Sequence, residues 1–327
     1  MNAPASLVPT APTVSVVMPA WNALAFIDAA VHSVLSQSYR DLELIVIDDG
    51  STDGDYAALA RLDPRVRVLH VARGGVGRAR NLGIRHARGR YIAFLDADDL
   101  WVPGKLKTQV EFLDAHPLVG VVFGEFYRWS CGADGQWPDP SVVFPDEQEL
   151  ARTSTERRGW MYTRLLMGDL LGMNTPVVRR ELFDTCGGFD EGMERGEDYD
   201  FWLRCAREVP MQGFASVMAV YRIHPASTMH RTVERNYLAE LLERARARWG
   251  LSDPDGHSVA ESLYRRRLGR AHFDHGYAHY WAEAGSPVVA AREFAAAFRL
   301  GCMMSRSAAF WGLAQLKRRR IGQRASA

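Results

Sequence analysis

Short apolar runs alternate with helical patterns along most of the first two thirds of the chain. Runs of this kind, each followed by apolar residues at helical spacing, predict repeated strand–helix–strand units. Such units fold into a mostly parallel sheet that is flanked by helices. The predicted strands are residues 14–18, 42–47, 66–71, 91–95, 119–123 and 214–221. The sequence therefore predicts an α/β, Rossmann-like domain over residues 14–227.

The rest of the chain has a different character. From about residue 228 onward it is rich in Ala, Arg, Glu and Leu, which favour helix, and we predict an all-helical C-terminal module over 228–327. Residues 1–13 are rich in Pro and Ala and lack the charged and apolar regions of a signal peptide, so we expect a disordered lead. The polar, Pro-containing segment 131–158 is predicted to be an irregular loop.

Composition excludes several classes of protein. A formal net charge of +1 argues against a general nucleic-acid binder. The 4 cysteines are widely spaced without a C-x-x-C pair, which is typical of reduced thiols in a cytoplasmic protein. No apolar run approaches the roughly 20 residues that span a bilayer. We therefore predict a cytoplasmic protein without a nucleic-acid partner.

Carboxylates follow two of the predicted strands. Asp48 and Asp49 end one strand, and Asp96, Asp98 and Asp99 follow another. Ligands of open α/β sheets bind at the carboxyl ends of the strands, and clustered carboxylates repel one another unless a cation or a donor-rich ligand neutralises them. Mg²⁺ and Mn²⁺ prefer such oxygen ligands and share them with substrate phosphates. The pattern indicates a divalent-cation site, although Asp-rich turns and helix caps look the same.

Three further segments offer chemistry but leave alternatives open. Glu197 and Asp198 follow a Gly at the predicted start of a helix, where an acid is either a helix cap or a general base. The Gly-rich segment 74–81 fits neither the dinucleotide nor the Walker pattern, but Arg80 could anchor a phosphate. His224 could contact a metal or a diphosphate, although a lone His is more often structural.

Together, these pieces resemble the inverting family 2 glycosyltransferases of bacterial type. Five segments carry the resemblance in the order that the family has them, and it covers about residues 14–227. They are VSVVMPAWN at 14–22, VIDDGSTD at 46–53, ARNLGI at 79–84, GRYIAFLDADD at 89–99 and GEDYDFW at 196–202. The resemblance implies a GT-A fold for this part, followed by the helical extension.

The resemblance also implies roles for individual residues. Asp198 would be the catalytic base, supported by Glu197, and Asp98 the direct ligand of a divalent cation, Mn²⁺ or Mg²⁺. Asp96, Asp99 and His224 are the further candidates for that metal site. The residues expected to contact the nucleotide sugar are Pro19, Ala20, Trp21, Asp48, Asp49, Arg80, Asp96 and Asp98.

The implied reaction is a single displacement that transfers a sugar from a nucleotide-diphosphate sugar, expected to be UDP-linked, to a hydroxyl group. Because the Gln-x-x-Arg-Trp signature and membrane helices of processive members are missing from the sequence, we expect one transfer to a glycan, a lipid-linked acceptor or a protein. The helical module could dock the acceptor, form a homodimer or rest on a membrane. Its tail combines the apolar residues 310–313 with the basic residues 317–320, which permits peripheral contact with anionic lipid.

Two other functions fit parts of this pattern. A nucleotidyltransferase that makes sugar nucleotides also uses acidic metal ligands on a related sheet, but it would carry a Gly-rich, basic loop where this chain has residues 19–22. A non-catalytic glycan-binding scaffold would have no need to keep Asp49, Asp98 and Asp198 together. A glycosyltransferase is therefore the favoured interpretation.

Overall fold

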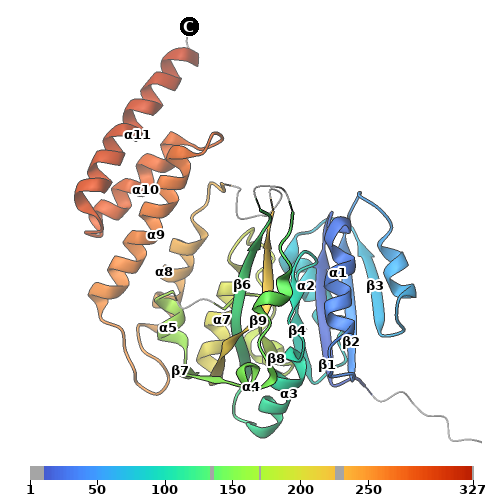
Figure 1. The fold of residues 1–327 in the computed structure, drawn as a ribbon. Coiled ribbons are helices and arrows are strands. Elements are labelled where there is room, and N and C mark those ends of the chain that lie inside the picture. The colour runs from blue at the N-terminus through green and yellow to red at the C-terminus, as the bar shows by residue number, and fades with distance from the viewer. Residues whose placement is uncertain (1–10, 133–135, 169–170, 225–231, 326–327) are drawn as a thin grey trace, which may run out of the picture. The chain divides into compact units, whose positions relative to one another are not determined.

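The computed structural model describes residues 11–132, 136–168, 171–224 and 232–325. The chain forms two compact units, and Figure 1 labels their helices and strands and colours them by residue number. The first unit comprises residues 1–159 and 171–224, and the second comprises 160–170 and everything from 225 onward. The predicted boundary between residues 227 and 228 lies outside the described residues, as does the predicted lead up to residue 10. Segment 160–168 belongs with the C-terminal helices, which its sequence did not indicate.

The first unit is built on a mixed sheet. Its strand order is β3-β2-β1-β4-β8-β6-β9-β5, with β7 beside β9. Neighbours within β3-β2-β1-β4 are parallel, as are β6 and β9, whereas the short β8 is antiparallel to β4 and β6. The strands are β1 (Val14–Ala20), β2 (Leu42–Asp49), β3 (Val66–Val71), β4 (Tyr91–Phe94), β5 (Leu100–Trp101), β6 (Val121–Ser130), β7 (Thr153–Gly159), β8 (Val177–Arg179) and β9 (Met211–Ile223). The predicted α/β class with a mostly parallel sheet is confirmed.

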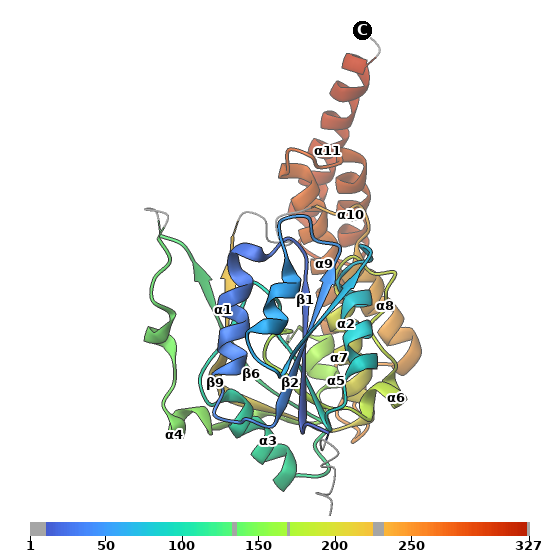
Figure 2. The same cartoon turned by 90° about the vertical axis from the view of Figure 1, so that its right-hand side faces the viewer.

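Helices cover both faces of this sheet. Figure 2 shows α1 and α2 on opposite sides of β1 and β2. Every residue of β1 and β2 is buried, which explains why these strands read as continuous apolar runs. The helices of this unit are α1 (Leu24–Leu35), the 3₁₀ helix η1 (Tyr56–Arg61), α2 (Val76–His86), α3 (Lys105–Ala115), the 3₁₀ helix η2 (Pro140–Val143), α4 (Glu147–Leu150), α6 (Leu182–Cys186) and α7 (Glu197–Glu208).

Strand register brings the predicted acids to one edge of the sheet. Ala20 at the end of β1 lies opposite Asp48 in β2, and Val17 of β1 lies opposite Phe94 at the end of β4. The amide of Leu95 then donates to the carbonyl of Val17 at 3.2 Å, which carries the chain directly into the Asp96 loop. Since the strands run in the same direction, their carboxyl ends place both acidic segments at a common edge.

The prediction of an irregular loop over residues 131–158 was wrong in part. Its described portion contains η2, α4 and most of β7, and β7 pairs antiparallel with β9, Gly159 opposite Met211 and Thr153 opposite Phe214. The strand has the sequence TSTERRG, and none of its residues is buried. A polar strand at the margin of a sheet lacks the apolar pattern by which strands are recognised, so it could not be predicted from periodicity.

The second unit is all-helical, as predicted. Its core gathers Phe273, Ala290, Phe294 and Ala297, against which Phe310 packs. Helix α5 is tied to this unit by hydrogen bonds: the Tyr162 hydroxyl donates to the Ala245 carbonyl at 3.1 Å, and the Thr163 amide donates to Asp253 at 2.9 Å. The helices are α5 (Tyr162–Leu166), α8 (Tyr237–Trp249), α9 (Glu261–Trp281), α10 (Pro287–Arg299) and α11 (Met304–Ala325).

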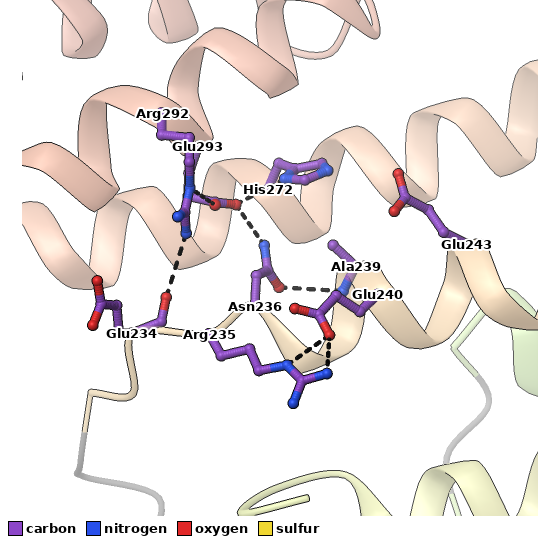
Figure 3. Close-up of a pocket in the computed structure, with 9 residues that line it drawn as sticks. All are labelled: Glu234, Arg235, Asn236, Ala239, Glu240, Glu243, His272, Arg292 and Glu293. Atoms are coloured by element: carbon purple, nitrogen blue, oxygen red, sulfur yellow. Dashed lines mark hydrogen bonds and ion pairs between the residues drawn. The ribbon is translucent and has the colours of Figure 1, made fainter.

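A buried carboxylate on α10 holds the helices of the second unit together. Glu293 accepts a hydrogen bond from Asn236 Nδ2 and contacts His272 Nδ1, each at 2.7 Å, beside an open cavity of about 370 Å³ (Figure 3). Asn236 also caps α8 by accepting from the Ala239 amide. Burial alone would raise the pKa of Glu293, but the bonds from His272 and Asn236 outweigh it and lower the pKa to about 2. One ionised group thereby joins α8, α9 and α10.

We expect Glu293→Gln to destabilise this helical unit. Because the pKa of Glu293 is about 2 in the fold and 4.5 in its absence, its stabilising effect is complete above pH 4.5 and is lost as the pH falls toward 2. The variant should lose about 2–3 kcal/mol of unfolding free energy at pH 7. Urea unfolding followed by circular dichroism at pH 7 and near pH 3 measures this, with exposed Glu243→Gln as control. An equal loss of unfolding free energy in both variants would contradict the stabilising role of Glu293.

Candidate active site

Of the three carboxylates after β4, two reach solvent and one is built into the protein. The side chains of Asp96 and Asp98 are 30% and 32% exposed, whereas Asp99 is 1% exposed. The two carboxylate oxygens of Asp99 accept from the Arg222 amide and from Asn174 Nδ2, each at 2.8 Å. Burial, reinforced by the charges of Asp98 and Asp96, raises the pKa of Asp99 well above its usual value. This position disfavours the metal-ligand role predicted for Asp99. Its side chain instead links the loop that follows β4 to strand β9 by hydrogen bonding.

Asp98 and His224 face each other at the edge of the sheet. His224 Nε2 lies 3.0 Å from Asp98 Oδ2, and the imidazole packs on Phe26 of α1 with the ring centroids 4.7 Å apart. Arg222 Nε donates to the backbone carbonyl of Asp98 at 2.8 Å. Burial and then the charge of Asp96 raise the pKa of Asp98. A bound cation would relieve both effects.

The donor set fits a hard divalent cation. Asp96 and Asp98 offer partly exposed carboxylate oxygens, which are the ligands that Mn²⁺ and Mg²⁺ prefer, and His224 adds an imidazole nitrogen, which is a softer ligand. Within the described ranges, no three His, Cys, Asp or Glu side chains gather closely enough to hold a metal by themselves. Additional ligands would have to come from water or from the phosphates of a substrate, as is common for Mg²⁺.

Arg80 of α2 joins the strand-end acids to the start of α7. Its Nη2 donates to Asp96 Oδ1 at 2.8 Å and its Nη1 donates to Glu197 Oε1 at 2.6 Å. The Arg80 side chain is 4% exposed, and its buried Nε has no partner among the described residues. Because two carboxylates hold the guanidinium, the geometry favours a positioning role for Arg80 over the phosphate contact that its glycine-rich segment predicted.

Asp198 lies beside this cluster in the first turn of α7. The N-cap of the helix is Gly196, in the left-handed region at φ 76°, and the Asp198 carboxylate accepts a local hydrogen bond from the Tyr199 amide at 2.7 Å. Burial and the charge of Glu197 raise the pKa of Asp198 to about 6, against the opposing effect of Arg80. A carboxylate with this pKa is ionised at neutral pH and still basic enough to accept a proton. Asp198 is thus suited to general-base chemistry rather than to capping.

A second cluster occupies the end of β2. The Asp49 carboxylate accepts from the amides of Gly74 and Gly75 at 2.7 and 2.8 Å, and Arg73 Nη1 lies 3.3 Å from it. The Arg73 guanidinium also stacks on Trp21, 3.5 Å from the ring centroid. In this structure the backbone amides of the two glycines are therefore occupied by the carboxylate of Asp49. Arg73 carried no pattern that identified it in the sequence.

The neighbouring predicted residues have different surroundings. Asp48 accepts from the Ser51 amide and contacts His70 Nδ1, both at 2.9 Å, and strand alternation directs it away from Asp49. Pro19 and Ala20 are buried within β1, and Trp21 just beyond them is 39% exposed. The structure therefore brings Trp21 and Asp49 together, and it joins Asp96 and Glu197 through Arg80 as a separate group.

Comparisons with known proteins find a matching family and related chains. The family model described as Glycosyl transferase family 2 matches residues 15–173. An uncharacterized glycosyltransferase from Haemophilus influenzae (strain ATCC 51907 / DSM 11121 / KW20 / Rd) is 33% identical over 202 residues, which are 61% of this chain and 73% of that protein.

Solved structures share the fold. The structure of S. aureus TarS 1-349 in complex with UDP-GlcNAc matches with a TM-score of 0.64 and 17% identity, covering 94% of this chain and 92% of that one. The mannosyltransferase PcManGT from Pyrobaculum calidifontis, in complex with GDP-Man and Mn²⁺, matches with a TM-score of 0.53 and 22% identity, covering 94% and 81%. At these identities the likeness concerns the fold alone.

Proposed function

The chain belongs to glycosyl transferase family 2, and from that premise we propose that it transfers a sugar from a nucleotide-diphosphate sugar to an acceptor hydroxyl with inversion at the anomeric carbon. The observation that carries the proposal is the Asp96–Arg80–Glu197 bridge. It supports a site in which Asp198, the group suited to accept a proton, lies near the acids proposed to hold a cation for the donor's diphosphate. A single displacement needs a base on one face of the sugar and a leaving-group site on the other, both held in one site.

The protein's own residues supply the proton transfer. Asp198 takes the proton of the acceptor hydroxyl while that oxygen forms a bond to the anomeric carbon. The bond between the sugar and the diphosphate breaks on the opposite face, and the nucleoside diphosphate leaves with the bonding electrons. The charge of Arg80 lowers the pKa of Asp198 and so keeps more of it ionised at neutral pH. The hydrogen bond from Arg80 to Glu197 holds the first turn of α7, which carries Asp198, in place.

We propose that Asp98 is the direct ligand of Mn²⁺ or Mg²⁺, that Asp96 or His224 contributes a second ligand, and that water and the donor's phosphates supply the rest. Such a cation stabilises the negative charge that grows on a leaving diphosphate. The raised pKa of Asp98 and the partial exposure of both carboxylates support the assignment, and a Mn²⁺-bound mannosyltransferase shares the fold. Asp99 is left out because its carboxylate is committed to Arg222 and Asn174.

We propose that the nucleotide lies at the ends of β1 and β2. Trp21 would border the base together with Pro19 and Ala20. The Asp49 oxygens already accept from the amides of Gly74 and Gly75, and a lone pair left on one of them would accept from a base imide, while Asp48, its neighbour in sequence, points to the other face of the sheet. A uridine nucleotide fits an imide-reading carboxylate, and TarS, which shares the fold, was solved with UDP-GlcNAc. A glycan, a lipid-linked molecule or a protein remains the predicted acceptor, and a homodimer remains a prediction.

A thermal-shift screen of sugar nucleotides, each with and without Mn²⁺, tests this function. A ligand that binds only the folded state raises the melting temperature according to its concentration and affinity. We expect a UDP-sugar to give the largest shift, and the shift to grow with Mn²⁺. A shift given instead by a nucleoside triphosphate with a sugar phosphate, accompanied by pyrophosphate release, would support the nucleotidyltransferase. Binding without any turnover of the donor would support the scaffold.

Arg80→Gln provides a test of the bridge itself. Arg80 lowers the pKa of Asp198, so its loss should move the acid limb of kcat/KM for donor turnover from near pH 6 to higher pH. The exposed Arg78 on the same helix gives the matched control Arg78→Gln, which should leave the limb in place. An unchanged pH profile in a folded Arg80→Gln protein would remove Arg80 from this role.

A further inference from the structure

Helix α11 carries an unusual concentration of positive charge. Residues 304–325 contain 6 Lys or Arg residues and no Asp or Glu, whereas the whole chain has a formal net charge of only +1. Arg306 and Arg318 are exposed. A one-signed charge on one helix of a nearly neutral protein creates a local field that attracts an anionic surface.

The same helix also exposes large apolar side chains. One side of α11 packs into the helical unit: Ala314 is buried, and Phe310 stacks on Phe294 with ring centroids 5.3 Å apart. Away from that side, Trp311, Leu313 and Leu316 are 46%, 45% and 56% exposed. Leu313 and Leu316 are three positions apart and so lie along the same flank of the helix.

The end of α9 that packs against α11 also exposes apolar rings. Phe310 contacts the ring of Tyr277 at 5.3 Å, and Lys317 Nζ donates to the carbonyl of Tyr280 at 2.7 Å, so the middle of α11 lies against the end of α9. Tyr277 and Trp281 there are 43% and 63% exposed. We call the exposed residues Tyr277, Trp281, Leu313 and Leu316 the apolar stripe. Apolar patches with basic borders mark surfaces that bind a partner.

We propose that the apolar stripe and the basic residues of α11 dock this unit onto an anionic phospholipid bilayer. Lys and Arg near a bilayer are drawn to anionic headgroups, while Trp, Tyr and Leu side chains enter the boundary between headgroups and acyl chains. A symmetric contact with a second copy would oppose two sets of 6 positive charges with no acid on either helix. In the described part of the chain no helix is long and apolar enough to span a bilayer, so the contact is with its surface.

Vesicle flotation of the full-length protein tests the proposal. We expect the protein to float with vesicles of phosphatidylcholine and phosphatidylglycerol but not with phosphatidylcholine alone, and binding to weaken as salt is raised. Leu313→Ser combined with Leu316→Ser should lower partitioning about tenfold or more, and Arg306→Glu with Arg318→Glu should do the same. The first unit offers a matched control, Leu62→Ser with Leu118→Ser, at 60% and 82% exposure.

Three outcomes would overturn the proposal. Equal binding to neutral and anionic vesicles would remove the role of the basic residues, and equal loss in the control variant would remove the role of the stripe. The third outcome is a wild-type dimer in light scattering that becomes a monomer in the variant with Leu313→Ser and Leu316→Ser. If neither protein then binds vesicles, the surface serves self-association. Circular dichroism and an unchanged melting temperature show that each variant is folded.

Discussion

Asp198→Asn is expected to lower the rate of sugar transfer by about 10²–10⁴-fold while leaving nucleotide-sugar binding nearly intact. The substitution keeps the shape of the side chain but removes the group proposed to accept the acceptor's proton, and Asp198 is not among the residues proposed to hold the donor. Turnover is measured as release of nucleoside diphosphate, and binding by titration calorimetry. Glu208→Gln, at the exposed far end of the same helix, is the control. Normal turnover by the Asn variant would end the assignment of Asp198 as the base.

The raised pKa of Asp198 also predicts how kcat/KM depends on pH and how Asp198→Asn changes the free energy of unfolding. Because the pKa of Asp198 is raised from 3.8 to about 6, wild-type kcat/KM should fall with acid below about pH 6. A carboxyl whose pKa is raised by folding destabilises the protein above that pKa, and the penalty vanishes below 3.8, where both states are protonated. Asp198→Asn should therefore raise the free energy of unfolding at pH 7 by about 1–3 kcal/mol. A variant that is inactive but more stable cannot owe its inactivity to unfolding.

Asp98→Asn is expected to reduce cation-dependent turnover by about a hundredfold or more. It replaces the proposed charged oxygen ligand beside His224 with a neutral amide, which would weaken the binding of a hard cation. The measurement is donor turnover as a function of Mn²⁺ concentration, in which the variant should need far more cation for half-maximal rate.

Asp99→Asn is the contrast to Asp98→Asn, since Asp99 is buried against Arg222 and Asn174. It should change the melting temperature and leave the cation requirement where it is. The opposite pattern, in which Asp99→Asn changes the cation requirement and Asp98→Asn does not, would exchange the two roles.

The parts of the fold that could be predicted from the sequence are those determined by residues close together in the chain. Strands β1 and β2 are buried on both faces, so their apolar runs were recognisable, as were the acids that end β2. Strand β8 has only the residues Val177–Arg179, and β7 is polar, so neither had a pattern to detect. Their place in the sheet depends on pairing with distant strands.

In the candidate site too, residues close together in the sequence could be predicted, whereas contacts between distant residues could not. A run of alternating carboxylates can be seen in the sequence, but which of Asp98 and Asp99 turns into the protein depends on Asn174 and on the Arg222 amide, far along the chain. The Arg80–Glu197 pair joins residues 117 positions apart, and no local spacing encodes it. Likewise, His70 meets Asp48 only because the β2–β3 register places them opposite each other.

The anomeric configuration of the product tests the central claim most directly. Proton NMR can follow the cation-dependent turnover of an α-linked nucleotide sugar by the purified protein, with water or an added alcohol as acceptor. A single displacement assisted by Asp198 predicts that the β-configured product forms first, before mutarotation, and that Asp198→Asn forms it about a hundredfold or more slowly. An α-configured first product, or the same product from Asp198→Asn at the wild-type rate, would contradict the account.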